Sequence, residues 1–528
     1  MGGRQVDVAV IGAGLGGLAC GTFLAKQGMR VAVFEHHYRP GGYCHAFRRG
    51  PYVFDAAIEY IGCCGKGQDV WNALRLLGAD RYIRFEEMDP KGFDRLYFPR
   101  HVVDVCRDFR EYQSRLEILF PQDRQGIREY FATLARIWQE IHVWGAAMFS
   151  WRFGRFPAVC PTLRKYVGKS LSHLLTATIR SPELRAILAG QSGNYALPPS
   201  RADLITHAII IMHFHNGAYY PHGGVQRLSD ALVKSLEDHG GELHLRKGIQ
   251  RILVGRRGVC GVELECGEVV HAKTVVSNAD PATTFFGLLH ENGTTRRRIP
   301  WQKPEYSLSS FQVYLGVRID LNRIGFGVRN HWLCPSYDFE KVYRVLFNGH
   351  LPKQTYALVT AQTLKDTSGT SAPPGAHILK ILTPVSIRSF GEWDDTKLGR
   401  RGKRYRGLKD HFAASLIEQA SQIVPGLQDR IECQVIGSPL TNVAYTRAPE
   451  GAMYGPARTP DQSGPTHLSP VTHVPGLYLT GTSVYYPGVL GAVGSGIMTG
   501  VLILRQKDTR TRAVVMDRIV ASQKDQRI

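Results

Sequence analysis

The sequence predicts an α/β protein in which a domain built on a parallel sheet is interrupted by an inserted, mixed α+β domain. Three features predict this arrangement: a glycine-rich turn after the first strand, an alternating apolar segment near the middle, and a glycine-rich helix near the C-terminus. With 528 residues and 43% apolar content, the chain is long enough to build more than one hydrophobic core.

The N-terminal segment 5-QVDVAVIGAGLGGLACGTFLAKQGMRVAVFE-35 has the pattern strand, helix, strand. Gly12, Gly14 and Gly17 follow the first strand with the spacing G-x-G-x-x-G. Such glycines permit a tight turn, a close approach of the backbone to a pyrophosphate, and close packing of helix on strand. Glu35 ends the second strand, where a carboxylate can accept hydrogen bonds from ribose hydroxyls. The segment predicts a dinucleotide site, which includes Leu15 at the start of the helix.

The next segment, 39-RPGGYCHAFRRGPYVFDAAIEYIG-62, favours FAD over NAD as the dinucleotide. It brings a second glycine pair, Gly41 and Gly42, close behind Glu35, and then Arg48 as a positive charge near the phosphates. An NAD-binding unit would instead continue to a third strand–helix pair. Residues 66–214 then show a helical pattern, with apolar spacing near 3.6 in 108–120 and 125–149.

The middle of the chain alternates between strand-like and helical patterns. Residues 242–281 predict three strands, the first ending at Ile249, where backbone groups would meet an adenine edge, and the last returning to the nucleotide-binding sheet. Residues 283–437 begin with the strand-like stretch 307–319, continue through the turn-rich loop 364–376, and end with a helix over 409–424.

Near the C-terminus, 476-GLYLTGTSVYYPGVLGAVGSGIMTG-500 predicts a strand over 477–480, a glycine turn, and a helix that begins at Gly488. The positive end of that helix would stabilise negative charge on a reduced flavin ring. The same glycines would also let a helix of small residues pack tightly on the sheet, and this explanation is compatible with the first. The expected cofactor contacts here are Gly481, Thr482, Gly491, Ala492 and Val493.

These motifs together resemble the phytoene desaturase superfamily, which includes carotenoid desaturases, carotenoid isomerases and retinol saturases. The resemblance is greatest in 41–62, 219–232 and 438–455, and it is poor over 66–205 and 283–436. One departure is Gly481-Thr482-Ser483, where many relatives carry an acid. The resemblance implies an FAD-binding, Rossmann-like domain of the glutathione-reductase type.

The implied domain organisation is discontinuous. Residues 1–65, 215–282 and 438–505 would form the FAD-binding domain, and 66–214 with 283–437 would form a substrate-binding or lid domain. Residues 506–528 would form a basic C-terminal tail.

Bound FAD would carry out hydride transfer, so the protein needs few acids or bases of its own. Glu59 is the candidate catalytic acid, since it follows the stretch that passes beside the flavin ring in similar proteins, and an apolar tunnel would raise the pKa of its carboxyl group. The alternative is a structural ion pair of Glu59 with an arginine. The candidate substrate contacts are Tyr60, Tyr219, Tyr220 and Tyr486.

The predicted function is FAD-dependent chemistry on C=C bonds of a long apolar polyene or isoprenoid, resembling a carotenoid or retinoid. Saturation, isomerisation and desaturation all remain open, because one flavin geometry serves all three. A non-covalent amine oxidase is a second class; a covalent cysteinyl flavin in the C-terminal segment is excluded because no cysteine follows Cys433. A flavin-free prenyl-lipid carrier on the same fold is a third, against which the intact glycine turn and Glu35 argue.

Charge and cysteine usage bear on partners and location. The net charge is +20, and aromatic and basic residues interleave within 147–169. Two explanations remain open: a soluble, highly charged surface, and peripheral contact with an anionic membrane surface. No nucleic-acid-binding motif accompanies the charge. The ten cysteines are scattered and do not have the spacing of metal ligands, so no metal site is expected. The same pattern is typical of reduced proteins, and a cytoplasmic location is therefore expected. No apolar run is expected to reach the length of a membrane span.

Overall fold

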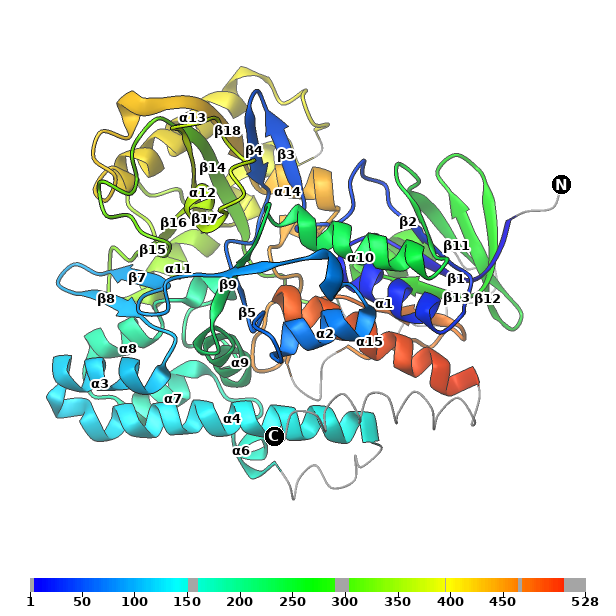
Figure 1. Ribbon diagram of the computed structural model, residues 1–528, viewed down its shortest axis with the longest axis horizontal. Coiled ribbons are helices and arrows are strands. Elements are labelled where there is room, and N and C mark those ends of the chain that lie inside the picture. Colours follow the sequence, from blue (N-terminus) through cyan, green and yellow to red (C-terminus); the bar gives the residue numbers. More distant parts are fainter. Residues whose placement is uncertain (1–3, 151–159, 290–302, 395, 464–467, 508–528) are drawn as a thin grey trace.

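A computed structural model describes residues 4–150, 160–289, 303–394, 396–463 and 468–507 of the chain. Within these residues the chain forms two large sheets of seven strands each, with helices packed around them (Figure 1). The parallel nucleotide-type sheet and the separate mixed sheet confirm the predicted fold class.

The first sheet draws its strands from three distant parts of the chain. Its order is β10-β2-β1-β13-β12-β11, with β19 added beside β13, and β10, β2, β1, β13 and β19 run parallel. The strands are β1 (Arg4–Ile11), β2 (Val31–Phe34), β10 (Glu242–His244), β11 (Ile249–Gly255), β12 (Gly258–Leu264), β13 (Val269–Ser277) and β19 (Leu477–Leu479). The N-terminal and C-terminal segments therefore belong to one sheet, joined through β13.

Three helices cover one face of this sheet: α1 (Leu15–Lys26), α10 (Gln226–Asp238) and α15 (Gly488–Lys507). Leu18 and Phe23 of α1 pack with Val493 and Ile497 of α15 in one buried cluster. Side chains of β1, β2 and β13 also form a second buried cluster, together with Ile252 of β11, Val262 of β12 and Phe285. Helix α15 lies beside α1 although the two are separated by most of the chain (Figure 1).

Helix α15 corrects one expectation. Among the described residues, its span Gly488–Gln506 is long and apolar enough to cross a membrane, with 61% of its most apolar window buried inside the protein. The expectation that no apolar run reaches this length is therefore wrong. Burial against α1 gives a physical reason for an apolar helix of this length.

The second sheet has the order β18-β14-β17-β16-β15-β7-β8. Its strands are β7 (Asp94–Tyr97), β8 (Val102–Val105), β14 (Ser309–Val317), β15 (Asn330–Leu333), β16 (Ala357–Ala361), β17 (His377–Val385) and β18 (Ile431–Gly437). Helix α13 (Gly402–Ala420) packs on it through Phe412 and Leu416. Residues 66–214 thus contribute strands as well as helices, contrary to the purely helical pattern expected, because β7 and β8 are only four residues long and give little periodic signal.

The remaining helices lie mostly at one end of the molecule, where α4 runs along its lower edge (Figure 1). They are α2 (Asp69–Leu77), α3 (Phe109–Leu119), α4 (Arg124–Ser150), α6 (Pro161–Tyr166), α7 (Leu171–Thr178), α8 (Pro182–Leu188), α9 (Leu204–His215), α11 (Phe339–Phe347), α12 (Gln362–Lys365) and α14 (Pro439–Thr446). Two small sheets complete the fold. One is the hairpin of β3 (Ala46–Arg49) and β4 (Tyr52–Asp55), and the other contains β5 (Ile61–Gly62), β9 (Ala218–Pro221) and β6 (Phe85–Glu87).

Residues 242–281 form four strands rather than the three expected, because β10 ends at His244 and β11 begins separately at Ile249. Ile249 therefore starts a strand instead of ending one. Residues 151–159, which hold much of the basic and aromatic sequence expected to contact a membrane, lie outside the described residues, as do the basic run 296–298 and tail residues 508–528.

Candidate active site

A cavity of about 670 Å³ extends from the glycine turn after β1 to the second sheet. Its walls come from both ends of the chain, from α2, α4 and α9, and from β14, β15, β16 and β17. The cavity therefore joins a polar end beside the nucleotide-type sheet to an end lined by apolar side chains.

At the polar end, the glycine turn leaves no room for side chains. Gly12 has a φ of +90°, and a Cβ atom added at Gly17 would lie 2.1 Å from the backbone oxygen of Gly12. At Gly14, an added Cβ would lie 2.6 Å from Nδ2 of Asn278. No side chain caps the N-terminus of α1, so its first N–H groups remain available to an anion. The turn has the shape required for a dinucleotide phosphate.

Glu35 lies at the end of β2, in the wall of the same cavity. Its carboxylate accepts hydrogen bonds from the backbone N–H groups of Ala13 (2.7 Å) and His37 (2.9 Å), and its Oε1 lies 2.8 Å from Nδ1 of His36. Burial raises the pKa of Glu35, but the contacts with His36 and the two N–H groups outweigh it, so the pKa is lowered. An ionised carboxylate is thus fixed beside the glycine turn, as a ribose contact requires.

The C-terminal segment closes on this turn. A Cβ atom added at Gly16 would lie 2.7 Å from the Cα of Gly481, and one at Gly496 would lie 2.4 Å from the backbone oxygen of Gly16. Gly488 and Gly491 at the start of α15 line the cavity. The positive end of α15 therefore borders the cavity that also holds the start of α1.

The structure brings together fourteen of the predicted site residues as cavity lining. These are Gly12, Gly14, Leu15, Glu35, Gly41, Gly42, Glu59, Tyr60, Ile249, Gly481, Thr482, Tyr486, Gly491 and Ala492. The other five predicted residues do not line the cavity. Gly17 packs against the backbone of Gly12, and Val493 lies in the buried cluster between α1 and α15. Arg48 lies on the β3–β4 hairpin, and Tyr219 and Tyr220 lie on β9. Tyr220 instead donates a hydrogen bond to the Asp55 carboxylate.

The far end of the cavity is mainly apolar. Its walls include Ile209, Ile210, Phe214, Trp332, Leu358 and Leu382. Tyr60 stacks on Phe214 with ring centroids 4.0 Å apart, and its hydroxyl donates to Asp94 (2.9 Å) and accepts from Asn194 (3.0 Å). Tyr60 thus presents a ring whose hydroxyl is already hydrogen-bonded. This end has the shape and polarity to hold a long apolar molecule.

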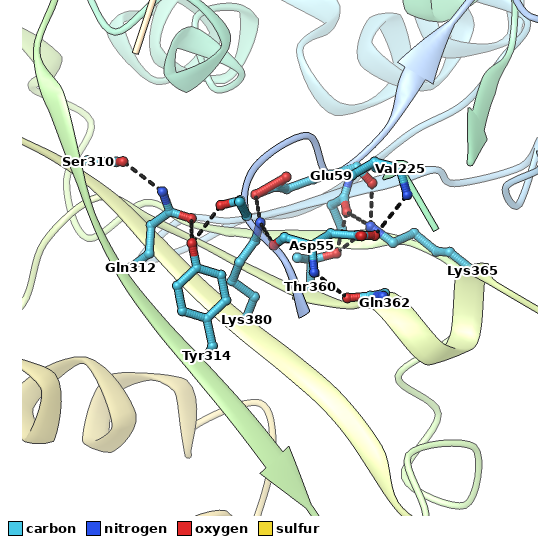
Figure 2. Close-up of polar contacts among 12 residues, drawn as sticks. Asp55, Glu59, Val225, Ser310, Gln312, Tyr314, Thr360, Gln362, Lys365 and Lys380 are labelled. Atoms are coloured by element: carbon cyan, nitrogen blue, oxygen red, sulfur yellow. Dashed lines mark hydrogen bonds and ion pairs between the residues drawn. The ribbon is translucent and has the colours of Figure 1, made fainter. Parts of the chain in front are cut away.

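Glu59 lies in the wall of this cavity and forms a buried ion pair, with Lys380 Nζ 2.7 Å from its Oε1. Figure 2 shows that Lys365 approaches from the other side and donates a hydrogen bond to the backbone oxygen of Glu59. Glu59 is 7% exposed, and its Oε2 has no hydrogen-bond partner among the described residues. The sequence analysis offered an ion pair of Glu59 with an arginine as the alternative role, and the structure shows an ion pair of Glu59 with Lys380 instead.

Several cavity residues escaped the sequence analysis. Asn278 follows β13 and lies against both Gly14 and Gly481, and Asp280, two residues later, lines the same cavity. Arg39 and Arg447, not Arg48, are the arginines that line the cavity. The stretch 277-SNAD-280 at the end of a predicted strand was the available signal for the first two. Lys365 and Lys380 gave a weaker signal, because their proximity to Glu59 arises only from tertiary packing.

A glycine turn on a parallel sheet, an acid after the second strand and a C-terminal helix directed at the same cavity define a dinucleotide-binding oxidoreductase of the flavoprotein type. Comparison with known proteins agrees: residues 15–285 match the family described as flavin containing amine oxidoreductase. That match covers just over half of the chain, which therefore belongs to this family and is a flavin-dependent oxidoreductase.

Curated relatives refine this placement. The chain is 27% identical to all-trans-retinol 13,14-reductase of Danio rerio, over 95% of this chain and 86% of that protein. It is 26% identical to a chloroplastic prolycopene isomerase of Daucus carota, over 97% of this chain and 82% of that protein. These relatives confirm the resemblance to the carotenoid desaturase and retinol saturase group.

Solved structures share the fold. Putrescine oxidase bound to putrescine superimposes with a TM-score of 0.63 at 16% identity, over 95% of this chain and 99% of that chain. This similarity confirms the flavoprotein architecture, and at this identity it carries no information about the substrate.

Proposed function

We propose that the chain is an FAD-dependent oxidoreductase that acts on carbon–carbon double bonds of a long apolar polyene or related isoprenoid. The observation that carries the proposal is the single cavity that joins the glycine turn to an apolar chamber lined by Ile209, Phe214, Trp332 and Leu358. The retinol reductase and prolycopene isomerase relatives, which are named for polyenes, support it.

In this proposal the diphosphate of FAD is held by the glycine turn and the uncapped start of α1, and a ribose by Glu35. When bound, FAD supplies or accepts the hydride. The start of α15 stabilises negative charge at the ring, and the apolar walls exclude water from the substrate. Glu59 is the candidate acid, since its carboxylate is the acidic group in the cavity wall next to Tyr60 and the apolar chamber.

A non-covalent amine oxidase is the second candidate, and the match to the flavin containing amine oxidoreductase family supports it. Tyr485 and Tyr486 line the cavity, but their rings meet edge to face at 75°, not as a parallel pair around an amine. The third class weighed from the sequence, a flavin-free carrier, is not supported, because the chain belongs to a flavin-containing family.

The experiment that tests the proposal is anaerobic incubation of the photoreduced flavoprotein with a panel of polyenes, with products read by mass. A gain of two hydrogens identifies a saturase, and unchanged mass with a new isomer identifies an isomerase. Turnover only with the oxidised protein identifies a desaturase. Turnover of primary amines, with all polyenes inert, would overturn the proposal.

Contact with an anionic membrane surface is a further part of the proposal, together with a cytoplasmic location. Its support is the net charge of +20 and the basic and aromatic composition of residues 147–169. The protein is expected to sediment with anionic vesicles at low salt and to be released at high salt. An absence of sedimentation at low salt would overturn this part alone.

A further inference from the structure

Two buried lysines lie directly behind Glu59. Lys365, at the end of α12, and Lys380, in the middle of β17, are 2% and 5% exposed. Lysine is rarely buried to this extent without a specific role or partner, because its charged ammonium loses water on burial. The pair therefore calls for a chemical explanation.

The two lysines differ in their partners. Lys380 Nζ pairs with Glu59 Oε1 at 2.7 Å and donates to the backbone oxygen of Asp55 at 3.3 Å. Among the described residues, Lys365 Nζ donates to uncharged groups: Thr360 Oγ1 (2.7 Å), Asn330 Oδ1 (3.2 Å) and the backbone oxygen of Glu59. Burial lowers the pKa of Lys365 to about 7. Lys380 is thus the lysine paired with a carboxylate, and Lys365 is the lysine whose pKa lies near neutral pH.

The charged surroundings of Lys365 come from several elements and partly offset each other. Glu59, Asp55 and Asp94 favour its charged form, and Lys380 disfavours it. The Lys365 Nζ also lies 4.8 Å from the centroid of the Tyr220 ring. The titratable groups that face it are Asp55, Glu59, Asp94, Tyr220 and Lys380.

Glu59 separates this cluster from the main cavity. Ile58 and Glu59 line both the 670 Å³ cavity and a second cavity of about 10 Å³, whose walls also include Lys365, Lys380, Tyr220 and Tyr314. A space of that size holds about one water molecule. Figure 2 shows Glu59 between the two lysine side chains, reached from opposite sides. Glu59 is therefore the residue that the buried cluster shares with the wall of the substrate chamber.

We propose that Lys380 and Lys365 form a proton relay that recharges Glu59, and that Glu59 delivers the proton to a carbon of the substrate. This inference rests on the proposed function and sharpens it. A supply of protons is needed for net saturation of a double bond and is not needed for isomerisation. The relay therefore favours saturation as the reaction.

The step balances as follows. The Glu59 carboxylate of the ion pair first takes a proton from Lys380 Nζ across the 2.7 Å contact. One carbon of the C=C then receives a hydride, which FAD would supply when bound and reduced, and the other receives the proton as the Glu59 O–H bond breaks. Lys380 is reprotonated from Lys365 through the shared small cavity, and Lys365 regains its proton from solvent on opening of the cluster. The double bond gains two hydrogens and the flavin loses two electrons.

The first test does not depend on any substrate. In the full chain labelled with 13C at lysine Cε, the NMR resonance missing from Lys365→Met identifies Lys365. It is expected to titrate near pH 7, and in Glu59→Gln to titrate at lower pH, because the attraction of the carboxylate is lost. Lys403→Met, at an exposed position on α13, should leave that resonance unchanged. Titration above pH 10, or no response to Glu59→Gln, would overturn the relay.

The second test uses single-turnover reduction of a polyene by the photoreduced protein. Glu59→Gln is expected to slow saturation by at least 100-fold with FAD still bound. Lys380→Arg preserves a cation beside Glu59 but does not release its proton, so it should slow saturation by at least 10-fold without loss of folding. Lys365→Arg should remove the inflection near pH 7 from the rate profile.

The two tests separate the possible failures. If the wild type saturates polyenes and Glu59→Gln and Lys380→Arg do so at the same rate, the relay is wrong and the proposed function stands. If the wild type isomerises or desaturates polyenes but saturates none, the relay is wrong and the proposed function stands. If the wild type turns over no polyene in any of these ways while the NMR coupling is present, the proposed function has failed, and delivery of a proton to a polyene fails with it.

Discussion

A Cβ atom on Gly16 would lie 2.7 Å from the Cα of Gly481, so α1 and the turn after β19 are in direct backbone contact. These residues stand near opposite ends of the chain, and their contact forms one wall of the cofactor cavity. The small size of Gly16 is thus a condition for closing the site.

Substitution of Gly16 should separate these two segments. Gly16→Val is expected to abolish FAD binding and to lower the free energy of unfolding by about 1–3 kcal/mol, because the added atoms meet backbone, which cannot move aside as a side chain can. Flavin content by absorbance and urea unfolding measure the two effects.

The matched control is Gly407→Ala, on the exposed face of α13 with open space around it. It should retain FAD and stabilise the protein slightly, as alanine does in a helix. Wild-type flavin content in Gly16→Val would show that the close approach is not required.

Removal of the Glu35 charge should weaken cofactor binding. Glu35→Gln keeps the side chain's shape but replaces the ionised oxygens expected to bind the ribose hydroxyls, so FAD affinity should fall by about 10- to 100-fold, which corresponds to about 1.5–3 kcal/mol. Quenching of flavin fluorescence during titration of the apoprotein measures it. Glu392→Gln, at an exposed ion pair with Arg404 away from the cavity, serves as the control, and equal affinities in all three proteins would contradict the assignment.

The ion pair between His142 and Asp69 in the cavity wall should make stability depend on pH. Burial lowers the pKa of His142, but the Asp69 carboxylate at 3.1 Å outweighs it, so the pKa is raised; the pKa of Asp69 is lowered. The ion pair contributes its full stabilisation of the fold below the ordinary pKa of histidine, and this stabilisation is lost as the pH rises through the raised pKa of His142. It is also lost at acid pH, as pH falls through the lowered pKa of Asp69.

Because both side chains are partly exposed, the contribution is small, below about 1 kcal/mol. His142→Gln should therefore lower the melting temperature slightly at pH 5.5 and leave it unchanged at pH 8.5. The same loss at both pH values would mean that packing, rather than charge, is what the substitution removes.

The apolar chamber should set the size of the substrate. Ile210 is partly buried and lines the cavity. Ile210→Trp is expected to weaken binding of the longest polyenes by at least 10-fold, with FAD content unchanged, because the indole fills the chamber without touching the glycine turn. Ile324→Trp, which places the same ring at an exposed position, is the control. An undiminished affinity for long polyenes would place the substrate elsewhere.

The nucleotide-type sheet could be predicted because its signals are local. The turn at Gly12, Gly14 and Gly17 and the acid at Glu35 stand within one strand–helix–strand unit, and most of the predicted contacts there line the cavity. Ile249 was placed at the wrong end of its strand, because the break between β10 and β11 is only four residues long.

The second sheet and the lysines beside Glu59 were harder to predict from the sequence, because this sheet is assembled from strands that lie far apart in the chain. Lys380 shows the limit: it lies in β17 between Ile378 and Leu382, on the same side of the strand, so a charge on a buried face was visible in 377-HILKILTPV-385. Its partner Glu59 stands more than 300 positions earlier, and pairing at such separation leaves no local pattern.

The joining of β1 and β19 to the same central strand, β13, has a consequence for biosynthesis. A ribosome must release the residues through α15, which ends at Lys507, before β19 and α15 can dock, so until then the face of α1 that α15 covers is exposed and the flavin has no closed pocket. Chaperone dependence and sensitivity to C-terminal truncation follow from that order of events.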